Sequence, residues 1–143
     1  MPMTTDKTDF ALSFMSALPQ AQALGLEILE LADGVAVIRM PYSEDLVGNP
    51  DTGVIHGGAV STLMDTCGGA ATIVHPDNAG GTATIGLRID YLRAATPGQA
   101  VTARAECHHI TRAIAFVRAT AHDDDPDRPV ATATGTFTVE TLA

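Results

Sequence analysis

The chain has 143 residues, of which 45% are hydrophobic, and eight Lys and Arg residues against seventeen Asp and Glu residues give a net charge of −9. This length fits one domain over residues 1–143 that buries roughly two-thirds of its unfolded surface, and the acidic balance excludes a general nucleic-acid binder. The longest apolar-leaning stretch contains an aspartate and several glycines, so we expect no membrane span and a soluble, cytoplasmic protein.

The first third of the sequence predicts a short helix and a hairpin. Apolar residues recur at helical spacing over residues 10–18, and Pro19 is expected to end that helix. Residues 25–31 and 35–41 are predicted strands, joined by a tight turn at the Asp33-Gly34 pair.

A loop and one long helix are predicted to follow. Residues 46–55 are rich in glycine, asparagine and proline, a composition typical of turns. From Gly57 to about His75 the apolar residues fall at three- and four-residue steps, which indicates a helix with one face toward the core. The stripe consists of Val60, Leu63, Met64, Cys67, Ala70, Ala71 and Val74.

Four further strands are predicted after the helix, at residues 82–92, 100–110, 112–121 and 130–140. The aspartate-rich break at residues 122–128 is predicted to be a solvated hairpin loop. Two strands, a long helix and four strands define an α+β domain in which about six antiparallel strands wrap around the helix.

Asp65 is the first functional candidate, because it is the one charged residue between Val54 and Pro76. Burying an unpaired carboxylate on an apolar helix costs several kcal/mol, so its presence needs a reason. At the start of the same helix, Gly57 and Gly58 expose backbone N–H groups that suit an anion or a carbonyl oxygen becoming negative during acyl transfer. Ordinary helix capping is the structural alternative.

The spacing of these residues has a geometric consequence. Asp65 lies eight residues after Gly57, which places it roughly 12 Å farther along the helix axis. If the Gly57 N–H group polarises a carbonyl that Asp65 helps to attack, the simplest arrangement is a two-fold homodimer in which each site combines Gly57 of one chain with Asp65 of the other.

Several of these residues form a pattern with polar residues before and after the helix. The pattern comprises Asn49, Gly53, His56-Gly57-Gly58, Asp65, Thr84 and Tyr91. It resembles the hotdog-fold acyl-CoA thioesterases of the phenylacetate-pathway (PaaI-like) group. The resemblance implies hydrolysis of an acyl-CoA to free CoA and a carboxylic acid without a metal or other cofactor, in a tetramer built from two dimers.

The resemblance also implies a role for each matched residue. Asp65 corresponds to the catalytic acid, acting as nucleophile or as general base on water, and Gly57 corresponds to the oxyanion donor. Asn49 corresponds to a loop amide near the thioester or the water. Thr84 corresponds to a hydroxyl that orients the water, and His56 corresponds to a histidine that braces the helix entrance.

Two other functions stay open at this point. A hotdog hydratase or dehydratase would act on an enoyl substrate, but Asp65 has no histidine partner at the helical spacing that such enzymes use. A non-catalytic acyl-CoA binding module would keep the pocket without needing Asp65.

The two cysteines, Cys67 and Cys107, are far apart in the sequence. This spacing signals neither a disulfide framework nor a zinc site, and we expect both to be small core residues.

Overall fold

The computed structural model describes residues 2–141, and it describes side chains from residue 7 onward. In that range the helices are α1 (Pro2–Ser16), α2 (Pro19–Ala23) and α3 (Gly57–Ile73), with a single 3-10 turn at Glu44–Leu46. The strands are β1 (Glu27–Ala32), β2 (Val35–Met40), β3 (Val47–Asn49), β4 (Val54–Ile55), β5 (Thr84–Tyr91), β6 (Val101–Ile110), β7 (Ile114–His122) and β8 (Ala131–Thr138).

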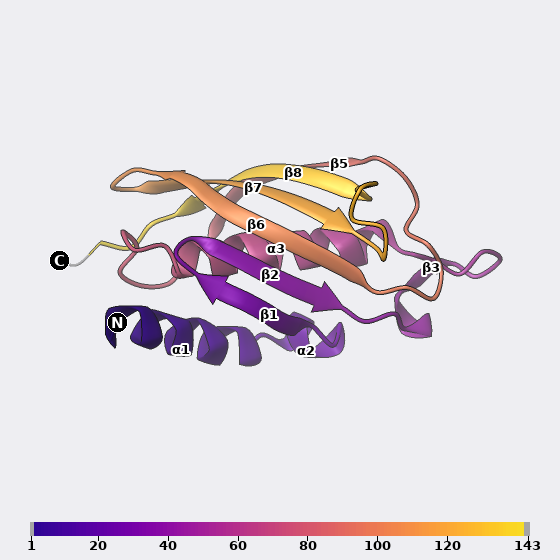
Figure 1. The fold of residues 1–143 in the computed structure, drawn as a ribbon, viewed down its shortest axis with the longest axis horizontal. Helices are drawn as coiled ribbons and strands as arrows, with labels where there is room; N and C mark the ends of the chain where they lie inside the picture. The colour runs from indigo at the N-terminus through magenta and orange to yellow at the C-terminus, as the bar shows by residue number, and fades with distance from the viewer. Residues whose placement is uncertain (1, 142–143) are drawn as a thin grey trace.

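Six strands form one antiparallel sheet in the order β1-β2-β6-β7-β8-β5, so β1 and β5 are its edges. The sheet packs over α3, and α1 runs beside β1 at one margin of the molecule (Figure 1). The predicted hairpin is present, and Asp33 and Gly34 both adopt positive φ at its turn. The α+β architecture of about six strands around a long helix is therefore confirmed.

The predicted apolar stripe of α3 forms the centre of the core. All seven of its residues are buried, together with alternate residues of β2, β6 and β7. Phe137 of β8 also reaches the helix, and a Cβ atom at Gly68 would lie only 2.7 Å from its Cζ atom. A side chain at Gly68 would therefore push this strand away from the helix.

Two local predictions were wrong. The predicted loop at residues 46–55 contains a two-stranded ribbon, β3 and β4, in which Val47 pairs with Ile55. Ile55 is buried, so this pair gains apolar contacts that the turn-rich composition hides. The helix predicted at residues 10–18 is instead α1, Pro2–Ser16, which starts earlier and ends before Pro19. Pro19 begins α2, because proline fits the first turn of a helix.

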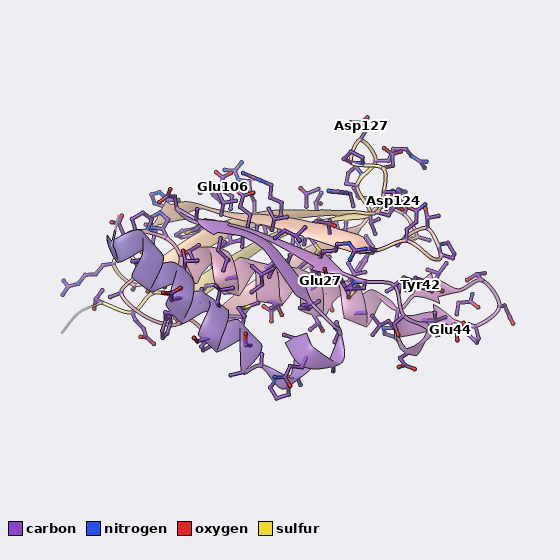
Figure 2. The ribbon with its side chains drawn as sticks, turned by 60° about the horizontal axis from the view of Figure 1, so that its bottom comes forward. Glu27, Tyr42, Glu44, Glu106, Asp124 and Asp127 are labelled. Carbon is purple, nitrogen blue, oxygen red and sulfur yellow. The ribbon has the colours of Figure 1, made fainter. Side chains whose placement is uncertain are left out.

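The hairpin loop at residues 122–128 is partly different from the prediction. Asp124 and Asp127 are exposed, and Asp127 lies at the tip of the loop, away from the body of the molecule (Figure 2). Asp123 is instead buried, with 4% of its surface exposed, and it accepts two hydrogen bonds from Arg93, of 2.7 and 2.8 Å. It also accepts hydrogen bonds from the backbone and the hydroxyl of Thr96. This ion pair ties the β5–β6 connection to the β7–β8 hairpin.

The ion pair gives a prediction about stability. The hydrogen bonds from Arg93 hold the pKa of Asp123 well below its usual range, against the opposing effect of burial. Its contribution to stability is therefore complete above an unfolded-state pKa of about 3.9 and declines as the pH falls below that value. We expect Asp123→Asn to lower the free energy of unfolding by about 2–4 kcal/mol at pH 7, measured by urea denaturation, and by less at pH 3.

The matched control is Asp124→Asn, which removes the neighbouring exposed carboxylate of the same loop. A surface change of this kind should stay within about 0.5 kcal/mol. Equal effects of the two substitutions would show that the ion pair contributes nothing beyond loop charge.

Candidate active site

The amino end of α3 presents one open backbone donor. His56 precedes the helix in extended conformation, and its Nδ1 atom accepts a hydrogen bond of 2.8 Å from the Gly58 N–H group. The Ala59 N–H group donates to the His56 carbonyl oxygen. Gly57 is the first helical residue, so its N–H group has no partner within the helix, and no acceptor for it occurs in the described part of the chain.

Tyr91, at the end of β5, holds the other side of this glycine. Its hydroxyl donates a 2.9 Å hydrogen bond to the Gly57 carbonyl oxygen. The same ring lies next to Gly57, since a Cβ atom there would make an ordinary contact of 3.6 Å with Tyr91 Cε1. The helix entrance is thus fixed by β5 as well as by its own cap. Tyr91 belongs to the sequence pattern, but the pattern gave no role for it.

Asn49 belongs to the ribbon that leads into the same helix entrance. The ribbon brings the preceding residue, Gly48, so close to His56 that an added Cβ atom would sit 2.8 Å from the His56 Cα atom. The Asn49 side-chain oxygen accepts a hydrogen bond from the Asp51 N–H group, which leaves the amide NH₂ group as the donor that this side chain can offer. The turn between β3 and β4 is held by Tyr42, whose hydroxyl donates a hydrogen bond to the Gly53 carbonyl oxygen. Figure 2 labels Tyr42 near one end of the molecule.

Asp65 lies about two turns farther along α3, and its side chain is hydrogen-bonded to a residue of β5. The Thr84 hydroxyl donates a 2.7 Å hydrogen bond to Asp65 Oδ1. Asp65 is half-buried and faces a cavity of about 570 Å³, which Ser61 and Thr62 of α3 and Ile89 of β5 also line. The carboxylate is therefore reachable from solvent through this cavity, and one of its oxygens is held by a hydroxyl.

The predicted site residues thus form two groups within one chain. His56, Gly57 and Gly58 form the helix entrance, with Asn49 on the adjoining ribbon, and Asp65 and Thr84 form the second group. The helical rise separates Gly57 from Asp65 by about 12 Å, so one chain does not bring the open N–H donor and the carboxylate to a single atom. The first group can stabilise a negative oxygen, and the second can attack or accept a proton.

Three other features bear on what the chain can do: the two cysteines, possible metal-ligand clusters and possible membrane-spanning helices. Cys67 and Cys107 are buried core residues, as predicted, and burial raises the pKa of the Cys67 thiol to about 12. Within residues 7–141, no three His, Cys, Asp or Glu side chains lie close enough together to hold a metal ion. The described helices include none with the length and apolar character needed to cross a membrane.

Comparison with known proteins gives a consistent set of relatives. Residues 52–130 match the thioesterase superfamily. A Halobacterium salinarum protein named as a candidate esterase is 40% identical over 75 residues, which is 50% of this chain and 50% of that protein. The chain thus spans half the length of that relative.

Two further proteins match over more of the chain. The acyl-coenzyme A thioesterase PaaI of Escherichia coli K12 is 31% identical over 91 residues, covering 62% of this chain and 60% of that protein. The solved structure of E. coli PaaI superposes with a TM-score of 0.84 over 96% of both chains at 22% identity, a likeness of fold. A crystal structure from Pseudomonas aeruginosa has a TM-score of 0.82 and 39% identity, covering 92% of this chain and 98% of that chain.

Proposed function

The chain belongs to the thioesterase superfamily, and we propose that it hydrolyses an acyl-CoA thioester to free CoA and a carboxylic acid at a site shared by two chains. The superfamily match and the likeness to PaaI confirm the resemblance to PaaI-like hotdog thioesterases. The acyl-CoA substrate is supported by the name of the E. coli relative, an acyl-coenzyme A thioesterase.

Asp65 supplies the attacking group in this proposal. Its carboxylate either attacks the thioester carbonyl carbon or takes a proton from a water molecule that attacks it. The carbon–sulfur bond then breaks, and the CoA sulfur leaves as a thiolate. In the first route the acyl group stays on Asp65 as a mixed anhydride, which water hydrolyses to release the carboxylic acid, restore the carboxylate and supply the proton of the thiol. In the second route the water oxygen becomes part of the carboxylic acid, and the proton held by Asp65 passes to the thiolate. The hydrogen bond from Thr84 supports this role, because it fixes one carboxylate oxygen and leaves the other for the reaction.

The Gly57 N–H group stabilises the negative charge that develops on the carbonyl oxygen. Its open donor lies where the partial positive charge of the helix amino end is greatest. His56 and Tyr91 hold the next peptide group, between Gly57 and Gly58, because His56 accepts from its N–H group and Tyr91 donates to its carbonyl oxygen. Asn49 offers an amide donor at the same entrance, directed to the thioester or the water.

The edge strand β5 supports a shared site. One edge of β5 has no neighbouring strand within the chain as the structure describes it. Ile85 of this strand and Leu92, the residue directly after it, each expose 55% of their surface. A long edge strand with exposed apolar side chains is a surface that a second strand would cover. Two copies of β5 could pair antiparallel about a two-fold axis and extend the sheet from one chain into the next.

The residues on β5 make this pairing chemically useful. Thr84 holds Asp65 at one end of the strand, and Tyr91 holds Gly57 at the other end. A two-fold axis between Leu87 and Arg88 would set Thr84 of one copy opposite Tyr91 of the other. The carboxylate of one chain and the N–H donor of its partner would then lie next to each other, which removes the 12 Å separation. This arrangement of two groups on one strand is the observation that carries the proposal.

The function is tested by incubating the purified protein with acetyl, medium-chain, long-chain, benzoyl and phenylacetyl CoA esters and measuring the release of CoA thiol. We expect release from at least one ester. Binding of the esters without thiol release would instead indicate a non-catalytic module. Hydration of an enoyl-CoA without thiol release would indicate a hydratase, and either result would contradict the proposal.

A further inference from the structure

A second cavity adjoins Asp65 on the side away from the helix entrance. It has a volume of about 200 Å³, and it shares Asp65 and Thr84 with the larger cavity. On α3 the larger cavity is lined by Ser61 and Thr62, which precede Asp65, and the smaller one by Gly69 and Ile73, which follow it. The two cavities therefore follow one another along the helix and meet at the carboxylate.

The two cavities differ in chemistry. The larger one is lined by the hydroxyls of Ser61 and Thr62 and by the side chain of Gln20. It also has three apolar side chains in its lining, Leu18, Leu87 and Ile89. The smaller one is bounded mainly by apolar side chains from four parts of the chain, Phe14 and Met15 of α1, Leu18, Ile73 of α3 and Phe137 of β8. A thioester has a polar arm on the sulfur side of its carbonyl and an acyl group on the other side. The lining thus becomes more apolar beyond Asp65, which matches that order.

We propose that the smaller cavity binds the acyl group and that two residues of its lining, Gly69 and Phe14, set the largest acyl group accepted. This inference rests on the proposed thioesterase function and adds a substrate class to it. An apolar cavity of about 150 Å³ holds a benzene molecule, so about 200 Å³ accommodates a single aromatic ring or an acyl chain of about six carbons.

Gly69 is suited to this role because the space beside it is open. A Cβ atom there would meet nothing closer than Thr82 Cγ2, at 3.6 Å, which is an ordinary contact with another residue lining the cavity. A glycine inside a helix weakens that helix relative to alanine, so the backbone has no need of it here. The missing side chain keeps the cavity open. Gly68 differs, because a side chain there would collide with Phe137.

The first test fills the cavity with Gly69→Leu. We expect the wild-type protein to prefer hexanoyl-CoA over acetyl-CoA and decanoyl-CoA. In Gly69→Leu, kcat/KM for hexanoyl-CoA should fall at least about tenfold relative to acetyl-CoA, because the added side chain takes the space of the distal carbons. Gly69→Ala, which adds one methyl group, should give a smaller shift in the same direction. Melting temperature and particle size verify that both variants fold.

The second test enlarges the cavity with Phe14→Ala, and it tests the proposal even if Gly69→Leu does not fold. We expect kcat/KM for decanoyl-CoA to rise at least about threefold relative to hexanoyl-CoA, since shortening Phe14 lengthens the cavity. Leu12→Ala is the matched control: Leu12 is an exposed apolar residue of the same helix and does not line the cavity.

The outcomes separate the two claims. An unchanged ratio between short and long esters in the folded variants would overturn the acyl-cavity inference while thioesterase activity remained. Failure of the wild-type protein to release CoA from any ester would contradict the proposed function itself.

Discussion

Replacing Asp65 with asparagine should reduce thioester turnover by at least about a hundredfold, because an amide neither attacks the carbonyl carbon nor accepts the proton of water. The substitution keeps the shape of the side chain and leaves an oxygen that can still accept the hydrogen bond from Thr84. We therefore expect an unchanged melting temperature and particle size. The measurement is the rate of CoA thiol release with the best ester of the panel.

The matched control is Asp77→Asn, which removes an exposed carboxylate shortly after the end of the same helix. Its turnover should equal that of the wild-type protein. CoA release by Asp65→Asn near the wild-type rate would remove Asp65 from the chemistry. An Asp65→Asn protein that unfolds would indicate a structural carboxylate instead.

Replacing Gly57 with proline should abolish activity to a similar extent. Proline has no N–H group, and the first residue of a helix is the position where a helix tolerates it best. His56 already has an extended backbone, with ψ at 136°, as the residue before a proline requires. The helix can therefore form without its open donor. Loss of one oxyanion donor costs about a hundredfold to a thousandfold in kcat.

The Gly57→Ala variant distinguishes the effect of losing the N–H donor from the effect of filling the space at Gly57. Alanine keeps the N–H group, and its Cβ atom would make only an ordinary 3.6 Å contact with the Tyr91 ring. We expect this variant to keep most of its turnover. Equal losses in the alanine and proline variants would mean that space at Gly57 matters and that its N–H group does not.

The parts of the fold that follow from local periodicity could be predicted from the sequence. The three- and four-residue spacing of apolar residues after Gly57 identifies α3 and its buried face, and all seven predicted stripe residues are buried. The Asp33-Gly34 turn identifies the first hairpin. The isolated charge of Asp65 on that apolar helix singles out the carboxylate, which the structure places at the meeting point of two cavities.

Contacts between distant segments could not be derived in the same way. Asp123 stands among aspartates of similar appearance, and its burial depends on Arg93, thirty residues earlier in the chain. Thr84 is paired with Asp65 across nineteen residues, and composition or periodicity does not indicate that pair. The acyl cavity depends on Phe14, whose helix reaches α3 only in the folded chain.

The most direct test of the shared site combines the two inactive chains. Asp65→Asn and Gly57→Pro chains are co-expressed with different affinity tags, and dimers that carry both tags are isolated by two successive purifications. In such a dimer one site joins the intact Gly57 of the first chain to the intact Asp65 of the second, and the other site carries both defects.

The account predicts that these mixed dimers regain about half of the wild-type turnover, since one of their two sites is complete. Dimers purified with either tag alone from single expressions should stay inactive. If both sites were built within single chains, every site of a mixed dimer would carry one defect. Mixed dimers of verified composition that release no more CoA than either parent would contradict a site formed between two chains.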